Sequence, residues 1–212
     1  MIHLKSLACI VFTGIILSSG SHPDVYFSAN KQLRRDINSK EQISTVFQDK
    51  EWWKSKLNQM IEKQIKARGI TDERLLEAIR NTPRHQFVPE KYEHAAYKDG
   101  PLPIGHGQTI SQPYIVALMT DKLDLQGDEK VLEIGTGSAY QAAILSHMAS
   151  EVYTIEIVEE LAREATQRVD KMGYDNVHVR HGNGYKGWPE QAPFDRIIVT
   201  AAPEEIPEEL IE

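Results

Sequence analysis

The sequence predicts an α/β fold in which a parallel β-sheet is flanked by helices. The first observation is a short apolar run, Lys130–Ile134, that passes through two glycines one residue apart and opens into a helical pattern over Tyr140–His147. The second is that strand and helix patterns continue to alternate after this turn. Such alternation is typical of right-handed βαβ units, which build parallel sheets with helices packed against them.

Four segments follow one another along the 212 residues. Residues 1–20 carry a cation, a short apolar run and small residues, a pattern typical of a secretory signal and too short to span a bilayer. Residues 21–48 are polar and lack periodicity, so we expect an extension. Residues 49–110 are expected to form a helical N-terminal part of the domain, and residues 111–212 its α/β core.

The helical part begins at Glu51, where apolar residues recur at helical spacing until Gly69 supplies a stop. Thr71 is the expected N-cap of a second helix, which Pro83 ends. The segment Pro83–Gly107 is rich in proline, glycine and aromatic residues, and we expect it to be mostly loop.

Ser111 can cap a third helix, with Pro113 tolerated in its first turn. The residues Gly107–Ser111 form a polar approach to that helix N-terminus, where free backbone amides can hold an anion. A substrate carboxylate would fit there. Two roles for Ser111 therefore stay open, a helix cap and a ligand contact.

Beyond the glycine turn, the expected order of elements is strand, helix, strand and strand. These elements are Val152–Glu156, Val158–Met172, Val177–Arg180 and Asp195–Thr200. Gly173 is expected to close the helix. In a parallel sheet the polar turns that follow the strands gather at one edge, and ligands bind there.

Composition argues against several functions. A formal net charge of −7, without a basic stripe, argues against a protein that binds nucleic acid. The single cysteine, Cys9, lies within the signal-like segment, so we expect no disulfide, thiolate nucleophile or cysteine-built zinc site. The histidines show no metal-ligand spacing, and we expect neither a metal site nor a stable membrane anchor.

The glycine turn indicates which ligand the sheet edge binds. A dinucleotide site would have a third glycine where Tyr140 stands, so that helix and strand could close on a pyrophosphate. Glu133, ahead of the first glycine, would repel phosphate, and Glu156, at the tip of the next strand, is placed to hold ribose hydroxyls. The pattern favours a phosphate-free adenosyl ligand such as S-adenosylmethionine over NAD.

Four blocks of this sequence resemble protein-L-isoaspartate O-methyltransferases, in the same order along the chain. They are Gly107–Pro113, Val131–Ser138, His181–Pro189 and Ala192–Pro203. The resemblance covers the chain from about Leu57 onward. It implies a Rossmann-like class I methyltransferase fold. It also implies an enzyme that transfers methyl from S-adenosylmethionine to the free carboxylate of L-isoaspartyl and D-aspartyl residues in damaged proteins, which initiates their repair.

The resemblance also implies roles for individual residues. The cofactor-binding residues would be Thr109, Ile110, Glu133, Gly135, Thr136, Gly137, Glu156, Ile157, Gly182 and Asn183. Ser111 corresponds to the family's active-site residue, and we assign it a hydrogen bond that orients the substrate. No general base is expected, because the acceptor carboxylate is already ionised at neutral pH. Thr200, Ala201 and Ala202 would receive the damaged peptide.

Three departures from the family pattern bear on activity. Ala139 replaces a usual third glycine, and its methyl is expected to crowd the ligand. Asn183 replaces a usual aspartate, which removes a charged acceptor for the adenine amino group. The family continues past the helix start at Ile206, so we expect this sheet to lack its C-terminal strands.

Two alternatives stay open at this point: a methyltransferase of the same fold with another acceptor, and an inactive truncated remnant. We expect a monomer. The resemblance implies a cytoplasmic protein, whereas the signal-like segment predicts export to the periplasm.

Overall fold

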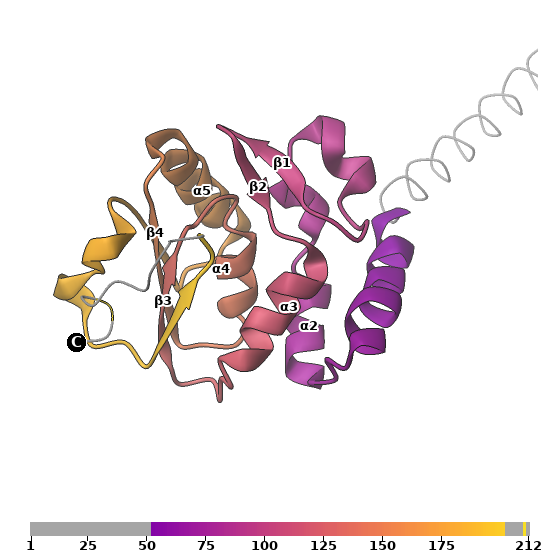
Figure 1. Ribbon diagram of the computed structural model, residues 1–212, viewed down its shortest axis with the longest axis horizontal. Helices are drawn as coiled ribbons and strands as arrows, with labels where there is room; N and C mark the ends of the chain where they lie inside the picture. The colour runs from indigo at the N-terminus through magenta and orange to yellow at the C-terminus, as the bar shows by residue number, and fades with distance from the viewer. Residues whose placement is uncertain (1–51, 202–209, 211–212) are drawn as a thin grey trace, which may run out of the picture. The chain divides into compact units, whose positions relative to one another are not determined.

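The computed structural model describes residues 52–201 and Leu210 (Figure 1). The predicted signal-like segment, 1–20, and the polar extension, 21–48, lie outside these residues. Within the described part of the chain, no helix is long and apolar enough to cross a membrane.

A four-stranded parallel sheet lies at the centre of the described residues (Figure 1). Its strands are β3 (Lys130–Ile134), β4 (Glu151–Glu156), β5 (Val177–His181) and β6 (Arg196–Val199), in the spatial order β5-β4-β3-β6. Ile134 pairs with Ile155 on one side and with Val199 on the other, so these three strands end at one level. The parallel sheet predicted from the alternating pattern is confirmed.

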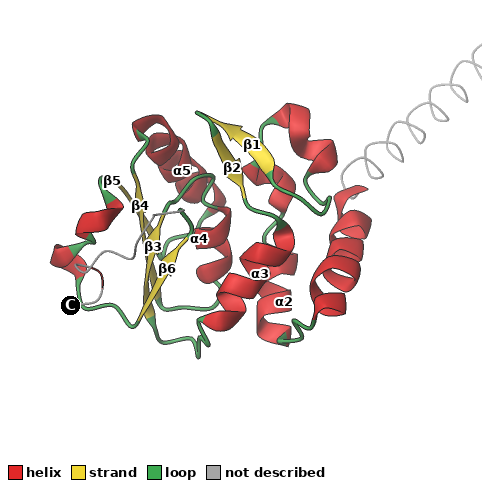
Figure 2. Ribbon diagram, viewed as in Figure 1, coloured by secondary structure: helices red, strands yellow, loops and turns green. Residues whose placement is uncertain are grey.

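Helices pack against one face of this sheet (Figure 2). Four α-helices of the described residues are α2 (Glu73–Asn81), α3 (Pro113–Lys122), α4 (Tyr140–Leu145) and α5 (Glu159–Met172). α4 and α5 contact β4 directly, and α2 packs on α4. The 3₁₀ turns η5 (Gly184–Lys186) and η6 (Pro189–Gln191) lie on the other side of the sheet.

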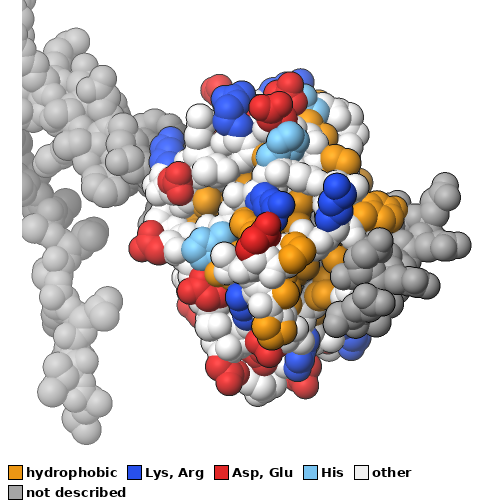
Figure 3. Space-filling view, turned by 90° about the vertical axis from the view of Figure 1, so that its left-hand side faces the viewer, with side chains coloured by type: hydrophobic (Ala, Val, Ile, Leu, Met, Phe, Trp, Pro, Cys, Tyr) orange, Lys and Arg blue, Asp and Glu red, His pale blue; other side chains and the backbone are white. Residues whose placement is uncertain are grey.

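The pleat of the strands divides their apolar side chains between the two faces. Val131 and Val152 are fully buried in the main core with the helices. Leu132 and Ile155 point the other way and pack in a smaller cluster that includes Trp188. Figure 3 looks onto this second side and shows hydrophobic side chains gathered among charged ones.

The first helical stretch agrees with the prediction at its end. Residues 52–60 are α-helical, and a π-helical turn, η1 (Ile61–Ile65), and a 3₁₀ turn, η2 (Lys66–Arg68), follow. Gly69 then adopts a φ of 94°, a left-handed conformation that glycine accepts without a steric penalty.

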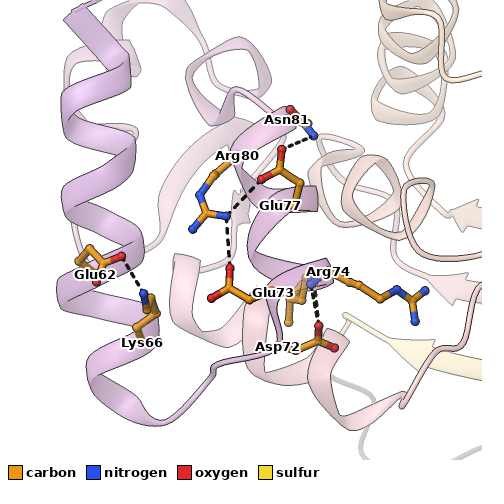
Figure 4. A network of polar contacts seen from close by, with 9 residues as sticks. Glu62, Lys66, Asp72, Glu73, Arg74, Glu77, Arg80 and Asn81 are labelled. Atoms are coloured by element: carbon orange, nitrogen blue, oxygen red, sulfur yellow. Dashed lines mark hydrogen bonds and ion pairs between the residues drawn. The ribbon is translucent and has the colours of Figure 1, made fainter.

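Asp72, and not Thr71, caps α2 (Figure 4). Its side chain accepts hydrogen bonds from the backbone amides of Arg74 and Leu75, at 2.8 and 3.3 Å. A carboxylate satisfies these unpaired donors and also interacts favourably with the positive end of the helix dipole. The predicted cap is therefore wrong by one residue.

The segment expected to be mostly loop contains a β-hairpin. β1 (Leu102–Gly105) pairs antiparallel with β2 (Gln108–Ile110), and the turn between them has positive φ at Gly105, His106 and Gly107. Two 3₁₀ turns, η3 (Arg84–Phe87) and η4 (Glu90–Ala95), precede the hairpin. Because β2 is followed within two residues by α3, the hairpin fixes where α3 begins.

Candidate active site

A cavity of about 360 Å³ opens at the carboxyl ends of β3 and β4, with the hairpin on its other side. The volume falls in the range of small-molecule sites. Its lining includes eleven residues that the sequence predicted: Thr109, Ile110, Ser111, Gly135, Thr136, Gly137, Glu156, Ile157, Asn183, Thr200 and Ala201. Segments up to about 90 residues apart in the chain thus meet where a parallel sheet binds its ligand.

The first glycine of the turn allows two strand ends to approach closely. Gly135 has a φ of 104°, and a Cβ built on it would lie 2.8 Å from Thr200 Oγ1 and 2.9 Å from the Ala201 nitrogen. The Thr200 hydroxyl in turn donates to the carbonyl oxygen of Gly135, at 2.6 Å. Only glycine therefore lets the end of β6 pack against the turn after β3.

Glu156 is held by the backbone on both of its oxygens. Its Oε2 accepts from the Gly137 amide at 2.7 Å, and its Oε1 accepts from the Val158 amide at 3.0 Å. A carboxylate offers about four acceptor positions, so both oxygens keep capacity for further donors. This fixed carboxylate lines the cavity and can accept hydrogen bonds from two hydroxyls of a ligand.

Glu133 lies behind the cavity and does not line it. Its side chain is fully buried; Oε2 accepts from the Thr154 hydroxyl at 2.7 Å, and Oε1 has no partner. Because Thr154 donates to Glu133, the Thr136 hydroxyl, 2.6 Å away, donates to Thr154. Glu133 thus reaches the cavity only through a chain of two threonine hydroxyls.

Burial raises the pKa of Glu133 to about 8, and the nearby charge of Glu156 acts in the same direction. The side chain is therefore protonated at neutral pH. The repulsion of phosphate that the sequence pattern suggested does not come from Glu133, because a neutral carboxyl carries no charge. The carboxylate on the cavity wall is that of Glu156.

Ser111 does not cap a helix. Gln112 is the N-cap residue of α3, without a side-chain cap bond, and Pro113 occupies the first turn. The Ser111 carbonyl accepts from Arg84 Nη2 at 2.7 Å, while among the described residues nothing hydrogen-bonds to the Ser111 hydroxyl. Of the two roles left open, the structure excludes the cap and leaves the hydroxyl available to a ligand.

A sequence profile described as "Protein-L-isoaspartate(D-aspartate) O-methyltransferase" matches residues 55–212. The chain belongs to this family. The protein-L-isoaspartate O-methyltransferase of Opitutus terrae is 59% identical over 153 residues, which cover 72% of this chain and 66% of that protein. The protein of the same name from Gloeobacter violaceus is 55% identical over 153 residues, which cover 72% of this chain and 75% of that protein. This chain thus spans about two thirds to three quarters of their length.

Solved structures agree with the family assignment. One protein-L-isoaspartate O-methyltransferase shares 31% sequence identity, with a TM-score of 0.65 over 74% of this chain and 51% of that chain. A candidate member from Plasmodium falciparum, solved in complex with S-adenosyl-L-homocysteine, shares 26% identity, with a TM-score of 0.62 over 75% of this chain and 78% of that chain. The predicted class I methyltransferase fold is confirmed.

The end of the cavity that the family resemblance assigns to adenine is partly apolar. Ile157 and Tyr185 both line it, and their side chains are 67% and 49% exposed. Asn183 lines it too, although its Oδ1 already accepts from the Tyr185 amide at 3.0 Å. Gly182 is not on the wall; its amide donates to the Glu156 carbonyl at 2.9 Å and ties β5 to β4.

Ala139, the departure from the family's third glycine, does not crowd the cavity. It is fully buried, lies outside the cavity lining and has a φ of 66°. The cost of alanine here is thus the left-handed backbone conformation, about 1–2 kcal/mol, and not a clash with a ligand. The expectation that its methyl crowds the ligand is wrong.

The acceptor side is described only in part. Thr200 and Ala201 line the cavity, whereas Ala202 lies outside the described residues. Sequence reasoning missed several lining residues: Gln108, Val116, Ser138, Tyr140, Gln141 and Tyr185. Gln108, Ser138 and Tyr185 lie within the quoted blocks, and this was the only signal for them. Within the described residues, no three His, Cys, Asp or Glu side chains gather as metal ligands would.

Proposed function

We propose that this protein transfers a methyl group from S-adenosylmethionine to the free carboxylate of L-isoaspartyl and D-aspartyl residues in damaged proteins, and so initiates their repair. The observation that carries the proposal is that one cavity joins the Glu156 carboxylate to the free hydroxyl of Ser111. In a chain of this family, the Glu156 carboxylate suits a ribose and the Ser111 hydroxyl suits an acceptor carboxylate.

The residues present fit the cofactor. Glu156 would accept from the two ribose hydroxyls, since both of its oxygens keep free acceptor capacity. Ile157 and Tyr185 offer apolar surface to an adenine ring at the cavity rim. The carbonyl of Asn183 retains a lone pair for the adenine amino group. Gly135 and Gly137 both have positive φ, and without side chains they would let the backbone of the turn approach the ligand closely.

When bound, S-adenosylmethionine supplies an electrophilic methyl group on a sulfonium. The chain's own task is to orient the acceptor carboxylate and to exclude water, because an ionised carboxylate needs no general base. Ser111 would donate its hydroxyl hydrogen to that carboxylate. Thr109 and Ile110 would cover the reacting centre, and Thr200 and Ala201 would hold the peptide backbone beside it.

The test is methyl transfer from labelled S-adenosylmethionine to an isoaspartyl peptide and to its aspartyl twin of the same sequence. We expect label on the isoaspartyl peptide alone, as a methyl ester from which mild base releases labelled methanol. Equal labelling of both peptides would indicate another acceptor. A complete lack of label, together with a flat calorimetric trace for S-adenosylhomocysteine, would indicate an inactive remnant.

We also propose that the protein acts as a cytoplasmic monomer. The cofactor is made in the cytoplasm, and the family resemblance points to the same compartment. N-terminal sequencing of the natural product and sedimentation of the purified protein test this. A product that begins near residue 20 contradicts the compartment, and a stable dimer contradicts the monomer.

A further inference from the structure

Arg84 is a fully buried cation without a carboxylate partner. It is the largest of the fully buried side chains, with 0% exposure. None of the ion pairs found among the described residues involves it. A guanidinium stays charged in proteins, and burying an unpaired charge is costly. Packing alone does not explain why an unpaired charge is buried at this position.

The guanidinium of Arg84 joins four segments that are distant in the chain. Its Nε donates to the Ala96 carbonyl, just after η4, at 2.8 Å. Its Nη2 donates to the Ser111 carbonyl, between β2 and α3, at 2.7 Å. Its central carbon lies 4.9 Å from the centroid of the Tyr140 ring, at the start of α4, and Nη1 has no partner. Arg84 itself begins η3.

Two of these contacts are cavity residues. Ser111 and Tyr140 both line the cavity, although Arg84 does not. Next to Ser111, α3 starts without a side-chain cap and β2 is only three residues long, while the Gln112 side chain donates to Asp99 at 2.6 Å. Arg84 is the one side chain that hydrogen-bonds to Ser111 within the described residues. It therefore fixes where the Ser111 hydroxyl can lie.

We propose that Arg84 is a positioning residue for methyl transfer. It holds Ser111 and Tyr140 in fixed positions relative to each other, so that the acceptor carboxylate meets the methyl group in line. The inference rests on the proposed function. The planar fork of arginine donates in two fixed directions while its face meets an aromatic ring, and lysine cannot reproduce this. A misplacement of about 1 Å at a reacting centre can reduce the rate about 100-fold.

The test compares Arg84→Lys with Thr82→Val in the full chain. Thr82 is a matched control, because it is also fully buried, lies two residues away and donates to a carbonyl, that of Ala78, at 2.8 Å, without lining the cavity. For each variant we would measure kcat and KM for an isoaspartyl peptide and Kd for S-adenosylhomocysteine. We would also measure amide hydrogen exchange over residues 108–116.

For Arg84→Lys we expect kcat to fall at least about 10-fold, Kd for S-adenosylhomocysteine to change less than about threefold, and exchange over 108–116 to speed up. Thr82→Val should change none of these beyond its general loss of stability. Arg84→Gln, which needs no counter-charge and keeps a donor, serves as the second variant if lysine prevents folding. It should shift the same three quantities in the same directions.

Wild-type values of kcat and exchange in the Arg84 variants would overturn the inference. An equal loss of kcat in Thr82→Val would overturn it too, since the effect would then be general destabilisation. A wild-type protein that fails to label the isoaspartyl peptide defeats the proposed function instead. In that case the exchange over residues 108–116 still decides whether Arg84 positions Ser111.

Discussion

The Glu156 carboxylate accepts a hydrogen bond from the Gly137 amide at 2.7 Å, so the acid at the tip of β4 is bound to the glycine turn after β3. Nineteen residues separate the two in sequence. The turn and the acid therefore form one rigid unit, and a ligand held by one meets the other. Interpreting the glycines alone as a dinucleotide motif would miss the hydrogen bond between Gly137 and Glu156.

Replacing Glu156 with alanine should weaken the binding of S-adenosylhomocysteine about 10-fold to 100-fold. Hydrogen bonds to a charged group contribute roughly 1.5–3 kcal/mol, and 1.4 kcal/mol corresponds to a factor of 10 in Kd. Isothermal titration calorimetry measures the change. Glu160→Gln, which alters an exposed acid in the first turn of α5, is the control. An unchanged Kd in Glu156→Ala would mean that the ribose binds elsewhere.

Gly135→Ala should destabilise the protein by about 1–3 kcal/mol more than Gly173→Ala. Both positions have positive φ, so both variants carry the cost of a left-handed alanine, about 1–2 kcal/mol. A Cβ at Gly173 meets open space, whereas one at Gly135 meets Thr200 and Ala201 below 3.0 Å. Urea unfolding gives both free energies. Equal losses would show that the end of β6 can move away from the turn.

The stability of the Glu133→Gln variant relative to wild type should increase as the pH rises. Burial raises the folded pKa to about 8 from the ordinary value of 4.5, so between these values the folded state holds a proton that the unfolded state has released. The contribution of Glu133 to wild-type stability therefore declines from about pH 4.5 to pH 8 and then levels off, and the variant lacks this contribution. Thermal unfolding across this range, with Glu159→Gln as the control, measures the difference. Parallel profiles for wild type and Glu133→Gln would contradict the buried, protonated state.

Ser111→Ala should lower turnover about 10-fold while Kd for S-adenosylhomocysteine stays within about twofold, because a lost hydrogen bond to an anion is worth roughly 1.5 kcal/mol or more. Steady-state methylation of an isoaspartyl peptide measures turnover. Ser146→Ala, whose hydroxyl donates to the Ala143 carbonyl away from the cavity, is the control. If cofactor affinity and turnover fall together in Ser111→Ala, the assignment of Ser111 to the acceptor is wrong.

The parallel sheet and its ligand edge could be predicted because the signals are local. The run Lys130–Ile134, the two glycines and the acid of Glu156 each follow from patterns a few residues long. The hairpin β1–β2 could not be predicted, since its strands are only four and three residues long and β1 contains Pro103 and Gly105. Strands this short show no clear alternation.

The burial of Glu133 and Arg84 also could not be predicted. Glu133 is covered because Thr154, on the neighbouring strand, bonds to it, and pairing between strands is not visible in either strand alone. Arg84 stands in a polar, proline-containing stretch that is typical of a surface loop. Its burial depends on carbonyls 12 and 27 residues further along the chain.

The most direct test of the central claim is a crystal structure of this chain with S-adenosylhomocysteine. We expect the ribose hydroxyls within hydrogen-bond distance of Glu156, and the adenine against Ile157 and Tyr185. We also expect the sulfur to face the side of the cavity that carries Ser111. A ligand bound outside this cavity, or one whose ribose lies away from Glu156, would contradict the account.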